Sequence, residues 1–230
     1  MGDVCPERNR YEVWVLSAPG VYRPQEDTRL LAEAVATAAV PAGARVLDVC
    51  TGTGAVAIAA ARAGAGTVTA LDVSRRALLV TWLNGRLRGL PLRVRRGDLR
   101  NGVAGGPFDV VLANPPYVPY PGAGDGPAAR WDAGRDGRSV LGPLCAAAPA
   151  LLAERGFLLL VQSAISGVDP TLDRLREAGL KTSVVARARQ PFGPVLRRRA
   201  AYLEDRGLIE PGRRDEELVV IRADRTEPGS

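Results

Sequence analysis

From residue 45 onward, short apolar runs alternate with helical segments, and this alternation constrains the fold more than any other feature of the sequence. Apolar and β-branched runs bounded by turn residues predict strands. The predicted strands are Arg45–Val49, Thr67–Asp72, Leu92–Arg95, Phe108–Ala113, Phe157–Gln162, Thr182–Ala186 and Leu218–Arg222. Strands alternating with helices are typical of an α/β fold with helices on both faces of a mostly parallel sheet. The last two of the seven strands lack a crossover of the earlier type, so we expect an antiparallel edge strand.

The remaining segments predict five helices and two insertions. The helices are expected from Asp27 or Thr28, as the cap, to about Val40, over Ala55–Ala63, from the cap Ser74 to about Leu87, from after Asp136-Gly137 to about Ala153, and over Pro170–Ala178. We expect residues 1–40 to form an N-terminal extension and helix that packs on a core at residues 41–230. Insertions at about 118–135 and 189–215 interrupt the alternation, and long insertions are usually functional or mobile. The arginine-rich second insertion is interpreted as a solvated helical flap, and a clamp on a substrate is the alternative.

The chain contains no histidine, which limits its chemistry. Ser–His–Asp and Cys–His nucleophilic catalysis, HExxH zinc chemistry and histidine proton shuttles are all excluded. The three cysteines, Cys5, Cys50 and Cys145, are widely spaced, so we expect neither a disulfide framework nor a metal site. Any reaction must therefore use carboxylates, amides, tyrosines, backbone groups or a cofactor.

The chain carries a net charge of +6, but this charge is weak evidence for a nucleic-acid partner. Of its 31 basic residues only Lys181 is a lysine, and Ala, Gly, Pro and Arg abound, as in the product of a GC-rich coding sequence. A solvated arginine-rich surface is the favoured interpretation, although clusters at Leu196–Arg199 and Arg93–Arg96 leave a nucleic-acid groove as an alternative. Neither a signal peptide nor an apolar stretch of spanning length is visible, so we expect a cytoplasmic protein with no membrane partner.

A glycine-containing turn follows the first predicted strand. Val46–Gly54 places a strand, a tight turn and a helix start in the order that a nucleotide-type cofactor needs. Gly52 and Gly54 let the backbone approach a ligand closely, and Asp72, about 20 residues later, can accept hydrogen bonds from both hydroxyls of a ribose. A tight turn in any α/β protein is the alternative at this point.

The strand Phe108–Ala113 leads directly into Asn114-Pro115-Pro116-Tyr117. The prolines fix the backbone and remove two N–H groups, so nearby carbonyls stay available as acceptors. The Asn114 side chain and the Pro115 carbonyl could hold both N–H groups of a planar NH₂ acceptor, while Tyr117 adds an aromatic face. Such an NH₂ group is a poor nucleophile, so positioning it against an electrophile can contribute several kcal/mol to a group transfer. These four residues are the predicted catalytic residues.

The pattern Asp48-x-Cys50-x-Gly52-x-Gly54 resembles the cofactor loop of class I S-adenosylmethionine (SAM)-dependent methyltransferases, and Cys50 departs from it at the usual first glycine. The resemblance implies a Rossmann-like class I fold and SAM as the cofactor, with S-adenosylhomocysteine as the product. It places Asp48 and the loop at the methionine part, Asp72 at the ribose and Asp98 at the adenine amine. The Asn-Pro-Pro-Tyr motif argues against the rival, a NAD-linked dehydrogenase. The predicted cofactor-binding residues are Asp48, Cys50, Thr51, Gly52, Gly54, Asp72, Val73, Asp98, Leu99 and Asn114.

Three segments together resemble the HemK family, which methylates the glutamine of the Gly-Gly-Gln motif in translation release factors. They are Val21–Thr28, Asn114–Tyr117 and Trp131–Gly137. The chain is more similar to the short branch of that family than to the bacterial form with an extra N-terminal domain. The resemblance implies transfer of a methyl group to a protein glutamine amide, and it allows an activating partner protein. An adenine-N6 DNA or RNA methyltransferase, a small-molecule N-methyltransferase and, less favoured, a catalytically silent SAM-binding protein are the alternatives.

Overall fold

A computed structural model describes residues 14–103, 105–120 and 133–226. The predicted alternation is present. Its elements are α1 (Glu26–Thr37), β1 (Arg45–Val49), α2 (Ala55–Arg62), β2 (Thr67–Asp72), α3 (Arg75–Arg86), β3 (Leu92–Arg96), the 3-10 turn η1 (Leu99–Asn101), β4 (Phe108–Ala113), α4 (Leu141–Leu151), β5 (Leu152–Ser163), the 3-10 turn η3 (Ala164–Ser166), α5 (Asp169–Glu177), β6 (Lys181–Pro191), α6 (Pro194–Asp205) and β7 (Asp215–Asp224).

The strands form one seven-stranded sheet in the order β3-β2-β1-β4-β5-β7-β6. The first five strands of this order pair in parallel. β7 runs antiparallel to β5, and the edge strand β6 pairs antiparallel with β7. This topology confirms the predicted mostly parallel sheet with antiparallel pairing at one edge. Because β1 to β4 are parallel, their carboxyl ends all meet at one edge of the sheet.

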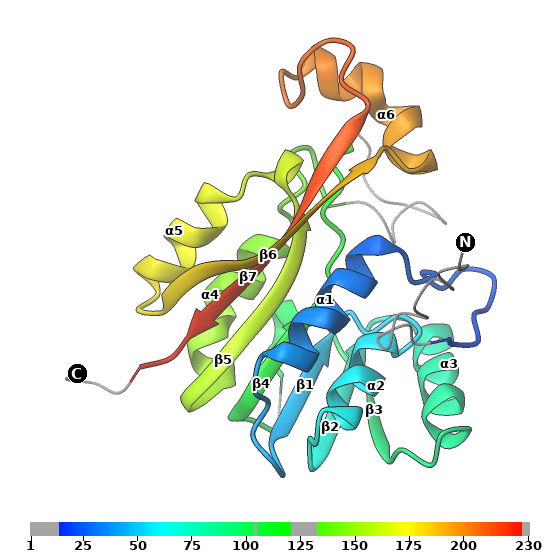
Figure 1. Ribbon diagram of the computed structural model, residues 1–230, viewed down its shortest axis with the longest axis vertical. Coiled ribbons are helices and arrows are strands. Elements are labelled where there is room, and N and C mark those ends of the chain that lie inside the picture. Colours follow the sequence, from blue (N-terminus) through cyan, green and yellow to red (C-terminus); the bar gives the residue numbers. More distant parts are fainter. Residues whose placement is uncertain (1–13, 104, 121–132, 227–230) are drawn as a thin grey trace, which may run out of the picture.

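Helices cover both faces of the sheet, as predicted. Figure 1 shows α1 and α2 on the near face and α4 and α5 behind the sheet, while α6 lies beyond the strand ends. The apolar stripe predicted on α1, formed by Leu30, Leu31, Ala34 and Val35, is buried. β5 carries the longest continuous buried run, as expected for a strand covered on both faces. The sheet core therefore forms a rigid base for the loops at its carboxyl edge.

Several elements differ from the predicted bounds. β5 begins directly after α4, five residues before the predicted strand, and β6 and β7 extend into the 189–215 segment. The predicted solvated flap is wrong, because α6 contributes Leu196 and Leu203 to a buried cluster with Phe192 and Ile209. The segment that resembles a HemK loop begins at Trp131, which lies outside the described residues, as does most of the 118–135 insertion.

Candidate active site

A cavity of about 470 Å³ lies at the carboxyl ends of β1 to β4, where open α/β sheets commonly bind ligands. Ten of the thirteen predicted site residues line it: Cys50, Gly52, Asp72, Val73, Asp98, Leu99, Asn114, Pro115, Pro116 and Tyr117. The other three, Asp48, Thr51 and Gly54, are not part of its wall. The fold thus brings the glycine loop and the Asn-Pro-Pro-Tyr motif to one cavity.

Asp48 is buried at 1% exposure and holds the glycine loop from within. Its Oδ2 accepts hydrogen bonds from the Thr51 hydroxyl at 2.5 Å and from the Ala57 backbone N–H at 3.2 Å. Burial raises the pKa of Asp48 to about 7, although these two bonds lower it, and the charge of Asp72 also raises it. The side chain therefore ties the end of β1 to the start of α2.

The glycine loop adopts left-handed backbone at three positions. φ is +59° at Cys50, +57° at Gly52 and +80° at Gly54. Cys50 thus takes the conformation that glycine favours, although the side chain is larger than the family pattern has. A Cβ atom on Gly54 would lie 2.7 Å from Cγ2 of Thr81, and the Thr81 hydroxyl donates to the Gly52 carbonyl at 3.1 Å. The tight turn therefore depends on glycine at position 54.

Two carboxylates follow β2 and β3 in the cavity wall. The Asp72 carboxylate accepts from the backbone N–H groups of Gly52 at 3.0 Å and Ser74 at 2.8 Å. Burial raises the pKa of Asp72, whereas these two hydrogen bonds lower it by a smaller amount. Asp98 forms an ion pair with Arg100 at 2.5 Å, and the hydrogen bonds from Arg100 lower the pKa of Asp98. A ligand amine at Asp98 would therefore meet a carboxylate that already has a cationic partner.

Cys50 is not suited to nucleophilic chemistry. Burial raises the pKa of its thiol, and the charges of Asp72, Asp48 and Asp98 raise it further. A neutral thiol is a poor nucleophile, so the position of Cys50 in the wall is consistent with contact to a ligand rather than with covalent catalysis.

The Asn-Pro-Pro-Tyr motif begins one residue after β4. Asn114 Nδ2 donates a hydrogen bond to the Thr28 hydroxyl at 3.2 Å, and Oδ1 accepts none from the part of the chain that the structure describes. The Tyr117 hydroxyl donates to Asp27 Oδ2 at 2.9 Å, so both ends of the motif are tied to the start of α1. The amide of Asn114 is thereby oriented, with its acceptor atom available.

Asp27 is a site residue that the sequence did not reveal. The predicted capping role is wrong, because α1 begins at Glu26, and the Asp27 carboxylate lies within the first turn at 4% exposure. It accepts from the Tyr22 hydroxyl at 2.7 and 2.6 Å as well as from Tyr117. Burial and the charge of Asp27 raise the pKa of both tyrosines, which remain neutral donors. The only signal was that Asp27 falls in the segment Val21–Thr28.

Arg199 of α6 is buried at 9% exposure rather than solvated. Its Nη1 donates to the carbonyls of Val118 and Pro119, each at 3.1 Å, and its guanidinium lies 4.3 Å from the centre of the Tyr120 ring. The arginine-rich stretch Leu196–Arg199 thus anchors the chain that follows Tyr117.

None of the described helices is long and apolar enough to cross a membrane. The same residues contain no cluster of three or more carboxylate or cysteine side chains that could hold a metal ion.

Comparison with known proteins places these features in a family. The model of the methyltransferase small domain matches residues 12–190. Methyltransferase HEMK2 of Mus musculus is 32% identical over 77% of this chain and 88% of its own length. A release factor glutamine methyltransferase of Deinococcus radiodurans is 41% identical over 61% of this chain, which spans about half (52%) of that relative.

The solved structures include a similar chain in the E. cuniculi Mtq2-Trm112 complex, described as responsible for the methylation of the eRF1 translation termination factor. It has 26% sequence identity and a TM-score of 0.63, over 90% of this chain and 99% of that one. The family match covers well over half of the sequence and includes both the glycine loop and the Asn-Pro-Pro-Tyr motif. The chain therefore belongs to the methyltransferase small domain family.

Proposed function

We propose that this protein transfers a methyl group from SAM to the side-chain amide nitrogen of a glutamine in a translation release factor. The observation that carries the proposal is the orientation of the Asn114 amide. Its Nδ2 donates to the Thr28 hydroxyl, so Oδ1 remains available to accept a hydrogen bond from the NH₂ group that is to be methylated. The names of the Deinococcus and E. cuniculi relatives support a release factor as the substrate. Because release factors act in the cytoplasm, the proposal places the protein there.

The residues of the cavity fit SAM. The Cys50–Gly52 turn in the wall leaves room for the amino-acid part of the cofactor. Gly52 has no Cβ atom that would narrow the cavity at this point. The Asp72 carboxylate accepts two backbone N–H groups and has lone pairs left for ribose hydroxyls. Val73 and Leu99 offer apolar contacts to an adenine beside Asp98. We assign the loop, Asp72 and Asp98 these roles on that basis.

The chain itself supplies positioning. Asn114 Oδ1 and the Pro115 carbonyl accept the two N–H groups of the glutamine amide, and this pair fixes the direction of the nitrogen lone pair. Thr28 and Asp27 hold the motif in place through Asn114 and Tyr117. When bound, SAM supplies an electrophilic methyl group on its sulfonium. Methylation makes the nitrogen acidic, so its proton is lost without a strong base, and a chain without histidine can carry out the reaction.

The experiment is to incubate the protein with methyl-labelled SAM and a recombinant release factor, and to locate the label by mass spectrometry. We expect label on the glutamine of Gly-Gly-Gln. Asn114→Ala should lower kcat, measured at saturating SAM, at least about 100-fold. Asn101→Ala is the matched control, since Asn101 is exposed and lies outside the cavity wall.

Two outcomes would contradict the proposal. Label found only in added DNA or RNA would favour the adenine-directed alternative, for which the same motif would hold a flipped base. An Asn114→Ala variant with unchanged kcat would refute the mechanism.

The proposal includes an activating partner protein, because the solved E. cuniculi relative forms a complex with Trm112. Adding such a partner should then raise the rate.

A further inference from the structure

Glu216, at the start of β7, is a buried carboxylate that the mechanism above does not use. It is 4% exposed and lies opposite Gln190 of β6 in the strand register. Gln190 Nε2 donates to Glu216 Oε1 at 3.0 Å. Oε2 is buried and has no hydrogen-bond partner among residues 14–103, 105–120 and 133–226. A buried hydrogen-bond acceptor without a partner costs free energy. Binding of a ligand group that donates a hydrogen bond to this atom would therefore be favoured.

The strand order places Glu216 on the opposite side of Asn114 from the proposed cofactor site. Along the cavity wall, Asp98 and Asp72 follow β3 and β2, Asn114 follows β4, and Glu216 and Gln190 lie at β7 and β6. The proposed SAM site uses the β1 to β3 side and ends at Asn114. The β7–β6 side is therefore the part of the cavity left for the chain that carries the acceptor.

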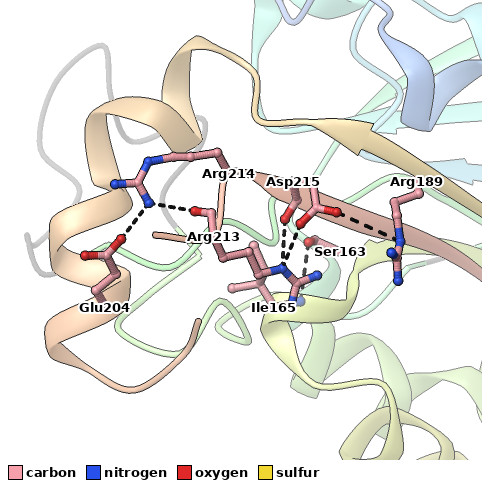
Figure 2. A network of polar contacts seen from close by, with 7 residues as sticks. All are labelled: Ser163, Ile165, Arg189, Glu204, Arg213, Arg214 and Asp215. Carbon is pink, nitrogen blue, oxygen red and sulfur yellow. Dashed lines mark hydrogen bonds and ion pairs between the residues drawn. The ribbon is translucent and has the colours of Figure 1, made fainter. Parts of the chain in front are cut away.

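A polar network fixes the segment that leads into Glu216. In Figure 2, Arg213 contacts Asp215, which also faces Arg189, while Arg214 reaches Glu204 on α6. Arg213 Nε donates to Asp215 Oδ1 at 3.1 Å, and Arg214 Nη1 donates to Glu204 Oε1 at 2.5 Å. The Arg189–Asp215 ion pair spans 4.0 Å. The start of β7 is thus joined to α6 and β6, so the Glu216 backbone is held before any ligand enters.

The neighbours of Glu216 do not complete its carboxylate. Tyr22 and Tyr117 direct their hydroxyls to Asp27. Burial raises the pKa of Glu216, and the charge of Asp27 adds to this rise. The Ser163 hydroxyl is near enough to lower that pKa, but it does not reach hydrogen-bond geometry with Oε2. Oε2 therefore has no hydrogen-bond partner among the described residues, and a donor that enters the cavity would supply one.

We propose that Glu216 is a substrate-binding residue, whose Oε2 accepts a hydrogen bond from an N–H group of the chain that carries the acceptor glutamine. The inference rests on the proposed function, since it assumes a polypeptide acceptor at Asn114. A carboxylate accepts N–H donors, and a polypeptide offers them along its backbone. Asn114 and Pro115 would hold the amide that reacts, while Glu216 would hold the chain to which that amide belongs.

The test compares Glu216→Gln with Glu217→Gln in steady-state methylation of a recombinant release factor. Glutamine keeps the shape and can still pair with Gln190, but it loses the charge and can place an NH₂ group where Oε2 was. We expect Glu216→Gln to raise KM for the release factor about 10- to 100-fold, with kcat and the Kd for SAM nearly unchanged. Glu217, one residue on, pairs with Arg187 on the surface and serves as the matched control.

The outcomes separate this inference from the proposed function. Glu216→Asp keeps the charge but withdraws the carboxylate by one carbon, and its KM should also rise, which guards against a folding defect in the first variant. A wild-type KM in both Glu216 variants would overturn the inference, as would losses in kcat and SAM affinity without a change in KM. If the wild-type protein methylates no release factor, the proposed function fails and the Glu216 assignment fails with it.

Discussion

Asp48→Asn should stabilise the protein, and more so at high pH. The folded-state pKa of Asp48 is raised to about 7 from an ordinary value of 3.8, chiefly by burial. The folded state therefore binds more protons than the unfolded state between these values, and the free energy of unfolding falls as the pH rises through that window. At about 1.4 kcal/mol per pKa unit, the full cost of the buried charge is of the order of 4 kcal/mol, of which about 3 kcal/mol accumulates between pH 5 and pH 8.

Asparagine keeps an acceptor for Thr51 and Ala57 but loses charge-assisted hydrogen bonds, so the net gain at pH 8 should be about 1 to 4 kcal/mol. Urea unfolding, followed by circular dichroism at pH 5 and pH 8, measures this gain as the difference in the free energy of unfolding between the variant and the wild type. The contributions of the other titrating groups cancel in that difference. Asp173→Asn, at an exposed ion pair with Arg176, is the control and should change stability by less than about 0.5 kcal/mol. A stabilisation that does not grow with pH would refute the assignment of the raised pKa to Asp48.

Two further variants test the positioning of the site. Thr28→Val removes the acceptor of Asn114 Nδ2, and kcat for the release factor should fall about 5- to 10-fold with the calorimetric Kd for SAM unchanged; an unaltered kcat would contradict the role of Thr28. Gly54→Ala forces a Cβ into contact with Thr81 at a φ of +80° and should lower the free energy of unfolding by about 1 to 3 kcal/mol in urea. Adding Thr81→Ser removes the methyl group that the new Cβ contacts, so only the part of the lost stability that is due to this contact should return. Full recovery would show that backbone strain at residue 54 is negligible.

The sequence was sufficient for the parts of the fold that depend on local pattern. Three predicted strands, Arg45–Val49, Thr67–Asp72 and Phe108–Ala113, have the observed bounds, because turn residues flank their apolar runs closely. The glycine loop and the Asn-Pro-Pro-Tyr motif lie at one cavity because each directly follows a parallel strand of the same sheet. Motif order along the chain is enough to predict this juxtaposition.

Asp27 shows where local pattern is misleading. An aspartate before an apolar helical stripe predicts a cap, because capping is the local use of its carboxylate. In the structure the acceptor atoms serve Tyr22 and Tyr117, and Tyr117 lies 90 residues away in sequence. A buried phenol needs an acceptor, but nothing in the sequence around Tyr117 says which carboxylate provides it. The choice depends on the packing of α1 against the motif, a tertiary contact.

The same reasoning explains why Glu216 was not predicted. The strand was expected to begin at Leu218, because inward-facing positions were identified by apolar side chains, yet β7 begins at Asp215 and its buried face includes Glu216 as well as Leu218. The three consecutive acidic residues have three different environments: Asp215 joins an ion-pair network, Glu216 is buried against Gln190, and Glu217 pairs with Arg187 at the surface. Strand alternation alone sets these environments. A criterion based on apolar side chains ends the predicted strand at Leu218, although the inward-facing positions continue to Glu216 in the cavity wall. Extending the predicted strand by its alternation would have placed this carboxylate in the cavity.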